Sequence, residues 1–325
     1  MSARTRLRMT RVLGVDGGQS GIRLRHASGD RIVEVAGVSR LEGDTVAAVA
    51  AAIARAWETS GFEPIDRVVL GLTTAPTDAL PRERLCALVG RATGATEVWL
   101  ADDAVTTHAG ALSLAWGVSV VAGTGVACLA VPEHRRPRII GGHGYLLGDE
   151  GGAFWIGREG LRAVLRAFDG RGPATNLSEA AARRFDGLDD LGDRLHSAAR
   201  PVNDIAQFAP EVLAVAEAGD EVAGRIADDA ATELVSLVRA GATAVGGAEV
   251  EGTDATIPVA LGGRLLEGAV TLRRRVDERL RAEQPRVAAR DADGSSLDGA
   301  LALGAASDPG RYRDLVHVWH QGRAA

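Results

Sequence analysis

Two glycine-rich turns, each set between short apolar segments, are the residues of this chain best suited to hold phosphate. The first turn comprises Asp16, Gly17, Gly18, Gln19 and Ser20, and the second comprises Gly123, Thr124 and Gly125. Such turns present unobstructed backbone N–H groups, which can donate hydrogen bonds to the oxygens of a polyphosphate. All 37 residues counted as lysine or arginine are arginines, so the Walker A loop and the protein-kinase fold, which need a phosphate-contacting lysine, are excluded. We therefore predict two strand–turn–strand hairpins that bind phosphate through the backbone.

Either turn taken alone could be no more than the tight turn of a β-hairpin. The pair favours a site for a magnesium–nucleotide complex, because Asp16 ends an otherwise apolar segment and a hydroxyl accompanies each set of glycines, on Ser20 and on Thr124.

A second pair of acids, Asp102 and Asp103, follows the apolar segment 97–100 and opens a predicted helix. Phosphoryl transfer to a hydroxyl needs positioning, charge neutralisation by Mg²⁺ and a carboxylate that accepts the proton late in the transfer. A carboxylate at a helix N-terminus stays ionised and can fill that role, although one of two such acids is often simply the N-cap. We assign Asp102 to the cap and Asp103 to the base, and the reverse assignment stays open.

The pattern of apolar residues predicts an α/β protein of two domains, 1–116 and 117–325, with a cleft between them and no low-complexity linker. The first domain has predicted strands at 11–16, 21–27, 31–36, 67–72 and 97–100, and helices at 44–60 and from 102 towards 115. The second has a hairpin from 117, a strand through 139–140, helices at 153–169, 177–197, 203–218 and 220–242, strands at 257–261 and 286–289, a helix at 297–306 and a tail at 316–323.

Glycines also gather in two later segments. Residues 141–152 hold six glycines and two acids, Asp149 and Glu150, so the backbone there must turn repeatedly or approach a ligand closely, with a floppy loop as the alternative. Gly262 and Gly263 follow a predicted strand and favour the close approach of a nucleoside.

The composition limits the partners and the compartment. A net charge of −6 argues against a surface for nucleic acid or for an anionic membrane. Cys86 and Cys128 lie far apart, which predicts neither a disulfide framework nor a cysteine metal site and fits the cytoplasm. The basic N-terminus is followed by a strand and a glycine turn, unlike a secretory signal, and no apolar run reaches the length of a membrane span.

Taken in order, these motifs resemble the actin-like sugar kinase superfamily, and within it the N-acetylglucosamine kinase group, also called the BadF/BadG/BcrA/BcrD-type ATPase family. The most specific match is Gly-Gly-x-Gly-x-Leu-Leu-Gly-Asp-Glu-Gly at 141–151. The other matching stretches are 13–23, 100–106, 120–127, 258–263 and 299–305, which together span nearly the whole chain.

The resemblance implies a two-domain actin-like ATPase (ribonuclease H-like) fold, each domain on a mixed five-stranded sheet, hinged around a nucleotide and sugar cleft. It implies that the last helix, about 297–320, packs back on the N-terminal domain. It further implies an ATP-dependent sugar kinase that uses Mg²⁺ and transfers the γ-phosphoryl group of ATP to a hydroxyl of an amino sugar, N-acetylglucosamine-like or glucosamine. The expected partners are the sugar and ATP, with a homodimer left open.

The resemblance also assigns roles to single residues. Asp16 matches the acid that holds the magnesium and its waters, and Asp103 matches the catalytic base, which also contacts the sugar. Nucleotide-binding roles fall on Gly17, Gly18, Gln19, Ser20, Gly123, Thr124 and Gly125 for the phosphates and on Gly262 and Gly263 for adenosine. Sugar-binding roles fall on Gly142, Asp149 and Glu150.

Three positions depart from the amino-sugar pattern. Ser39-Arg40-Leu41 replaces a Ser-x-Asn whose amide binds the sugar, Val126-Ala127 follows the second phosphate turn in place of polar residues, and His143 replaces an aromatic. Lost hydrogen bonds in a sugar pocket are costly, so we predict that N-acetylglucosamine is turned over poorly and that Arg40 pairs with an acidic substituent or is simply solvated. Two alternatives are an activator-type ATPase with an iron–sulfur cluster, for which the two cysteines lack the spacing, and a non-catalytic sugar-sensing protein of the same fold.

Overall fold

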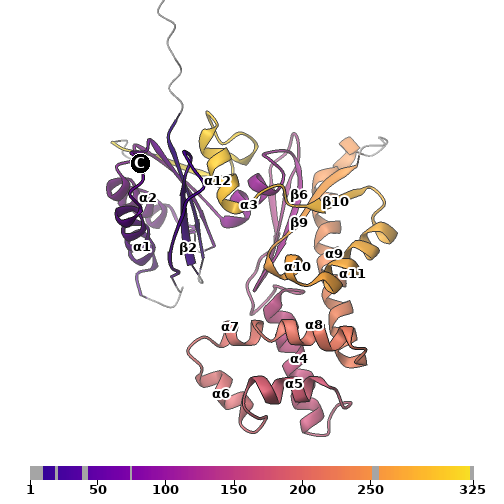
Figure 1. The fold of residues 1–325 in the computed structure, drawn as a ribbon. Coiled ribbons are helices and arrows are strands. Elements are labelled where there is room, and N and C mark those ends of the chain that lie inside the picture. Colours follow the sequence, from indigo (N-terminus) through magenta and orange to yellow (C-terminus); the bar gives the residue numbers. More distant parts are fainter. Residues whose placement is uncertain (1–9, 19–20, 39–42, 74, 251–255, 323–325) are drawn as a thin grey trace, which may run out of the picture. The chain divides into compact units, whose positions relative to one another are not determined.

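The computed structural model describes residues 10–18, 21–38, 43–73, 75–250 and 256–322, without the side chains of 247–250. Contacts divide the chain into two compact units (Figure 1). Unit 1 consists of Met1–Trp116, Val131–Pro137 and Ala292–Ala325, and unit 2 of Gly117–Ala130 and Arg138–Asp291. The sequence-based division into folding domains 1–116 and 117–325 stays a prediction.

Unit 1 is built on a six-stranded mixed sheet with the order β11-β5-β4-β1-β2-β3. The strands are β1 (Val12–Gly17), β2 (Gly21–His26), β3 (Ile32–Ala36), β4 (Arg67–Leu72), β5 (Glu97–Ala101) and β11 (His317–His320). β1, β4 and β5 run parallel to one another at the centre, whereas β2, β3 and β11 pair antiparallel with their neighbours. Every residue of β4 is buried, as expected for a central strand covered on both faces.

The helices of unit 1 cover both faces of this sheet. They are α1 (Thr45–Ser60), α2 (Ala79–Thr93), α3 (Asp103–Ala111), α12 (Ser296–Ala305) and the 3₁₀ turn η1 (Gly310–Tyr312). α1 and α2 lie on one face and α3 and α12 on the other (Figure 1). α1 begins where the Asp44 side chain accepts a hydrogen bond from the Ala47 N–H and ends at Gly61, whose φ of 62° suits glycine.

The crossing of α3 and α12 needs glycine on both helices. A Cβ on Gly299 would clash with the carbonyl of Thr106, and one on Gly110 would clash with the carbonyl of Ser295. The hydroxyls of Thr106 and Ser296 lie 2.8 Å apart across the same contact. α12 therefore fixes the position of α3, the helix that begins with Asp103.

Unit 2 is built on a five-stranded sheet with the order β10-β9-β6-β7-β8. The strands are β6 (Gly117–Ala122), β7 (Val126–Val131), β8 (Arg138–Gly141), β9 (Ile257–Gly262) and β10 (Val287–Asp291). β9 runs parallel to β6 and β10, and β7 pairs antiparallel with β8. The two sheets share a strand order. In each, the first strand of the unit has the next two strands of the chain on one side and two later strands, which run parallel to it, on the other side.

Eight helices accompany the sheet among the described residues of unit 2: α4 (Ala153–Phe168), α5 (Leu177–Arg184), α6 (Leu191–Ser197), α7 (Pro201–Ala206), α8 (Ala209–Glu217), α9 (Glu221–Val250), α10 (Arg264–Gly268) and α11 (Val270–Glu283). The long α9 packs on the sheet. α9 lies close to β6 at Gly241, where a Cβ would lie 2.6 Å from the Val118 side chain.

Several sequence predictions of elements were wrong in detail. The helix predicted at 177–197 is two helices, because Asp186 and Gly187 have φ values of 56° and 100°, which end a helix. The helix predicted at 203–218 is also two, α7 and α8, and Pro210 in the first turn of α8 cannot continue the earlier helix.

The first sheet also differs from the five strands that the resemblance implies. β11, in the segment predicted as a packing tail, adds a sixth strand antiparallel to β5. α2 was not predicted, and its N-cap Asp78 makes no side-chain capping bond. None of the helices in the described part of the chain is long and apolar enough to cross a membrane.

Candidate phosphate-binding and catalytic site

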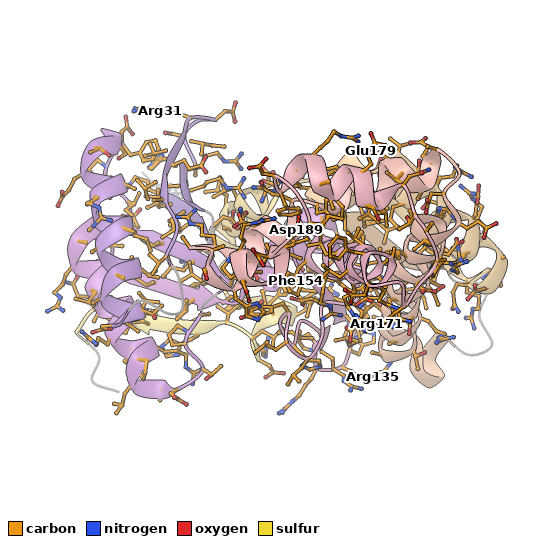
Figure 2. All side chains as sticks on the ribbon, turned by 90° about the horizontal axis from the view of Figure 1, so that it is seen from below. Arg31, Arg135, Phe154, Arg171, Glu179 and Asp189 are labelled. Carbon is orange, nitrogen blue, oxygen red and sulfur yellow. The ribbon has the colours of Figure 1, made fainter. Side chains whose placement is uncertain are left out.

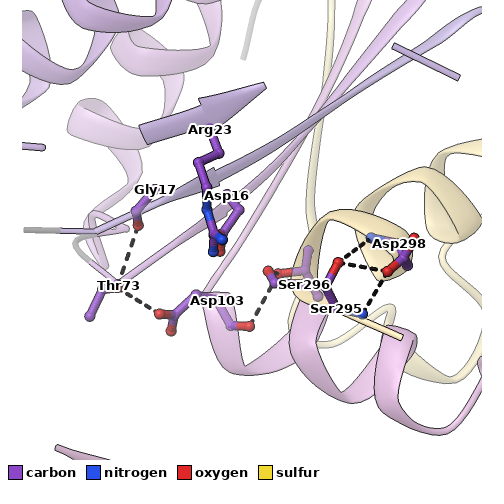
Figure 3. A network of polar contacts seen from close by, with 9 residues as sticks. Asp16, Gly17, Arg23, Thr73, Asp103, Ser295, Ser296 and Asp298 are labelled. Carbon is purple, nitrogen blue, oxygen red and sulfur yellow. Dashed lines mark hydrogen bonds and ion pairs between the residues drawn. The ribbon is translucent and has the colours of Figure 1, made fainter. Parts of the chain in front are cut away.

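The parallel strands of unit 1 bring three polar residues to one edge of the sheet. β1 carries Asp16 near its end, β4 is followed by Thr73, and β5 leads through Asp102 into Asp103. The carboxyl ends of neighbouring parallel strands form the usual ligand-binding edge of an α/β sheet. Figure 3 shows these residues together with Gly17.

Thr73 connects the first glycine turn with the predicted base. Its backbone N–H donates to the Gly17 carbonyl at 2.9 Å, and its hydroxyl donates to the Asp103 carboxylate at 2.6 Å (Figure 3). A Cβ on Gly18 would lie 3.1 Å from the same hydroxyl. Thr73 was not among the site residues predicted from the sequence, and the available signal was its place directly after a central strand. Gln19 and Ser20, the rest of this predicted turn, lie outside the described residues.

The two acids at the start of α3 have different surroundings. The Asp102 side chain accepts a hydrogen bond from the Ala104 N–H at 3.0 Å, so the predicted N-cap is confirmed. Asp103 lies in the first turn of the helix, where its side chain is turned toward Thr73. This leaves the Asp103 carboxylate as the acid that is not used as the cap, and its role as base stays a prediction.

Burial raises the pKa of Asp103 from 3.8 to about 7. The negative charges of Asp102 and Asp16 raise the pKa further, and the hydrogen bond from Thr73 opposes the shift. Burial thus outweighs the helix N-terminus, and the expectation that this carboxylate stays fully ionised is wrong. A carboxylate that binds its proton near neutral pH is suited to accept one from a reacting hydroxyl.

Asp16, the predicted magnesium residue, is held by an arginine from the neighbouring strand. Arg23 lies opposite Asp16 in the β1–β2 ladder, and its Nε donates to the Asp16 carboxylate at 3.1 Å. The Asp16 side chain is 15% exposed and that of Arg23 is 47% exposed. The described residues contain no group of three or more metal-ligating side chains, which is compatible with Mg²⁺ held mainly by nucleotide phosphates and one carboxylate.

In unit 2 the second glycine turn is fastened to the start of α4. The Gly123 N–H donates to the Gly125 carbonyl at 2.9 Å. The first N–H groups of α4, on Ala153 and Phe154, donate to the carbonyls of Gly123 and Thr124, each at 2.9 Å. Thr124 itself is exposed. The turn therefore has a fixed backbone and an accessible hydroxyl.

Asp149, predicted on the sugar side, contacts this second turn. Its carboxylate accepts a hydrogen bond from the Val126 N–H at 3.4 Å and fills the space beside Gly125, where a Cβ would clash with it. Burial raises the pKa of Asp149. Gly142 and Glu150 are exposed. The sugar contacts of these three residues stay predictions, and the Asp149 side chain contacts the second glycine turn.

The predicted adenosine motif lies beside the second turn within unit 2. Gly262, the last residue of β9, pairs with Val121. Gly263 has a φ of 95°, and a Cβ there would clash with the backbone of Ala122, the residue before the turn. Glycine at position 263 is thus required by close backbone packing that joins the two predicted nucleotide motifs.

The predicted site residues fall into two groups, one in each unit. Asp16, Gly17, Gly18 and Asp103 belong to unit 1. Gly123, Thr124, Gly125, Gly142, Asp149, Glu150, Gly262 and Gly263 belong to unit 2. Ser39, Arg40 and Leu41, which the resemblance predicts to lie at the sugar site, are outside the described residues.

Known proteins resemble this chain over different lengths. An N-acetylmuramic acid/N-acetylglucosamine kinase from Clostridium acetobutylicum is 30% identical over 146 residues, 44% of this chain and 48% of that protein. The chain thus matches about half the length of this relative. A glucosamine kinase from Vibrio cholerae is 27% identical over 232 residues, 70% of this chain and 78% of that protein.

A solved structure from Chromobacterium violaceum, provisionally described as an N-acetylglucosamine kinase, superimposes with a TM-score of 0.69. It is 26% identical and covers 92% of this chain and 99% of its own. With the two mixed sheets, this likeness confirms the predicted fold class, the two-domain α/β fold of actin-like ATPases.

The profile of the BadF/BadG/BcrA/BcrD ATPase family matches residues 13–297, which include both glycine turns, the acids that open α3 and the strand end at Gly262 and Gly263. The chain belongs to the BadF/BadG/BcrA/BcrD ATPase family.

Proposed function

We propose that the protein is an ATP-dependent carbohydrate kinase that transfers the γ-phosphoryl group of ATP to a hydroxyl of an amino sugar. The observation that carries the proposal is the contact of Asp103 with Thr73, which also bonds to the Gly17 carbonyl. A proton acceptor is thereby tied to a glycine turn suited to phosphate. Phosphoryl transfer to a hydroxyl needs these two parts in a fixed relation.

In this reaction Asp103 accepts the proton that leaves the sugar hydroxyl as the bond from its oxygen to phosphorus forms and the bond to the β-phosphate oxygen breaks. Backbone N–H groups of the two turns donate to phosphate oxygens. Asp16 would hold Mg²⁺, which neutralises phosphate charge when bound. The adenosine would lie beside Gly262 and Gly263.

An activator-type ATPase that shares an iron–sulfur cluster is less well supported. Such a cluster needs accessible cysteine thiolates. Cys86 and Cys128 are both buried, and burial raises the pKa of each thiol to about 12, which disfavours the thiolate that binds iron.

For the acceptor we propose an amino sugar other than plain N-acetylglucosamine. Val126 after the second turn is buried and apolar, so it offers no side-chain hydrogen bond to a sugar. The relative from Clostridium acetobutylicum is named for N-acetylmuramic acid, whose carboxylate is a substituent that an arginine such as Arg40 could pair with. The relative from Vibrio cholerae is named for glucosamine.

The test is a coupled assay of ADP release with a panel of sugars, glucosamine, N-acetylglucosamine and N-acetylmuramic acid included, and mass spectrometry of the product. We expect ADP release that depends on the sugar, with N-acetylglucosamine a poor acceptor. ADP release that is the same with and without every sugar would refute the kinase. A low KM and high kcat for N-acetylglucosamine, unaffected by Arg40→Ala, would refute only the acceptor proposal.

A further inference from the structure

A concave site lies in unit 1, and none of its residues belongs to the candidate site above. It is a surface pocket with a volume of about 720 Å³ between the loop after β7 and the segment around η1. We call it the arginine pocket; it is lined by Glu133, His134, Arg135, Arg136, Pro137, Gly310, Arg311, Arg313 and Asp314. Its size suits a small metabolite.

Both walls of the arginine pocket are fixed by the fold. The loop wall, Glu133 to Arg136, lies between the buried prolines Pro132 and Pro137, which restrict the backbone at each end. Arg135 in this wall is exposed and can be located in Figure 2.

The opposite wall is anchored by Tyr312, which is 1% exposed and whose hydroxyl lies 2.9 Å from Nδ1 of His108. The Gly310 N–H donates to Asp308 at 2.7 Å, and Arg313 Nε donates to the Gly310 carbonyl at 3.1 Å. The pocket is therefore formed before any ligand arrives, which lowers the entropic cost of binding.

The charge of the lining is opposite to that of the chain. Four of the nine lining residues are arginines and two are acids, whereas the whole chain carries a net charge of −6. An ion pair within the lining joins Arg136 to Asp314 at 3.5 Å, with side chains 86% and 41% exposed. Exposed pairs of this kind are weak, so Arg136 can turn to a bound anion.

A buried donor in the lining lacks an acceptor. Nη1 of Arg311 is buried and has no hydrogen-bond partner in the described part of the chain. A buried donor without an acceptor is costly, and more so when it belongs to a charged group. Arg311 also lines the pocket, so an anion bound there would offset the charge of its guanidinium group, and guanidinium groups bind phosphate with paired hydrogen bonds.

We propose that the arginine pocket binds a phosphate monoester of a small hydroxyl-bearing molecule. The arginines hold the phosphate. The carboxylates of Glu133 and Asp314 accept hydrogen bonds from hydroxyls, and inorganic phosphate, HPO₄²⁻, offers only one, on the same group that the arginines hold. The lining contains no aromatic side chain besides His134, so it offers little to stack on a nucleobase.

The test is calorimetric titration of the full chain, without nucleotide and at low salt, with glucose 6-phosphate, inorganic phosphate and glucose as probes. We expect saturable binding of glucose 6-phosphate and weaker binding of inorganic phosphate. Any binding of glucose should be unaffected by replacing the arginines of the pocket. Inorganic phosphate binding as tightly as glucose 6-phosphate would overturn the role given to the hydroxyls.

Three variants separate this pocket from other anion sites. Arg311→Gln should weaken glucose 6-phosphate at least tenfold and Arg136→Gln severalfold, whereas Arg55→Gln, at an exposed position on α1, should leave the affinity unchanged. Melting temperatures without probe report whether each variant folds. If Arg311→Gln fails to fold, a double variant that carries Arg136→Gln and Arg313→Gln takes its place in the test. An unchanged affinity in these variants would overturn the proposal, whatever the result of the kinase assay.

Discussion

Replacing Asp103 with asparagine should abolish activity and yet stabilise the fold. Asparagine has nearly the same shape, and its side-chain oxygen can still accept the hydrogen bond from Thr73. It can neither carry a charge nor accept the proton of a hydroxyl. We expect phosphoryl transfer to fall by about 10²- to 10⁴-fold, with nucleotide binding little changed.

The gain in stability follows from the raised pKa of Asp103. The pKa is 3.8 for the free side chain and about 7 in the folded chain, a difference of about three, and each pH unit corresponds to about 1.4 kcal/mol. The charged form therefore costs up to about 4 kcal/mol of folding free energy. Because Asp103 is only partly buried, solvent screening reduces this to about 2 kcal/mol.

The sign of the effect depends on pH. Below about pH 4 the carboxyl is protonated in the folded and the unfolded chain, and the cost vanishes. Between about pH 4 and about pH 7 the unfolded chain releases the proton more readily, so the stability of the unmodified protein falls as pH rises. Above about pH 7 both states are ionised and the cost stays constant. The variant with asparagine at this position carries no such cost at any pH.

Thermal unfolding of the unmodified protein and of Asp103→Asn at pH 5 and pH 8 measures this difference. For a chain of 325 residues, about 2 kcal/mol corresponds to a rise of roughly 3 °C in melting temperature at pH 8, and less than half of that rise is expected at pH 5. A lower melting temperature for the variant at pH 8, or the same difference at both pH values, would refute the reasoning.

Three further predictions follow from the contacts of the site and its supporting helices. Asp102→Asn keeps a capping oxygen but removes a charge that raises the pKa of Asp103, so the acidic limb of kcat/KM against pH should move to lower pH; an unmoved limb would count against Asp103 as the base. Arg23→Gln releases the Asp16 carboxylate, which Arg23 holds by a hydrogen bond, so half-maximal activity should need severalfold less Mg²⁺. A higher Mg²⁺ requirement would contradict this prediction. Gly299→Ala introduces a clash at the α3–α12 crossing and should cost about 1–3 kcal/mol in chemical denaturation, whereas Gly224→Ala, with open space around it, should cost nothing.

Local patterns in the sequence predicted most of the sheet. The strands β1, β2, β4 and β9 lie within one residue of their predicted bounds, because short apolar segments, and in β2 the alternation of apolar and polar residues, identify strands. The cap at Asp102 was also confirmed, since capping depends on residues within one helical turn.

What the sequence could not reveal depends on residues that meet only in the folded chain. β11 is a short strand, and it is a strand because Trp319 packs against Gly90 while its backbone pairs with β5. In the sequence Thr73 is one of many loop residues with a hydroxyl. Its place between the first glycine turn and Asp103 follows only from the position of β4 between β1 and β5. Asp149 belongs to a motif associated with sugar, yet its nearest support is the turn at Gly125.

The position of the predicted base depends on a helix about two hundred residues away in the chain. Asp103 begins α3, the backbone of α3 is pressed against α12 at Gly299, and the Thr106 hydroxyl meets Ser296 there. The Thr106 side chain also fills the space beside Gly71 of β4, because a Cβ on Gly71 would clash with this side chain. α3 is thus held between a strand and a helix through small residues that allow little displacement. The carboxylate at its start is consequently positioned by packing, and Thr73 needs only to set the orientation of the carboxylate.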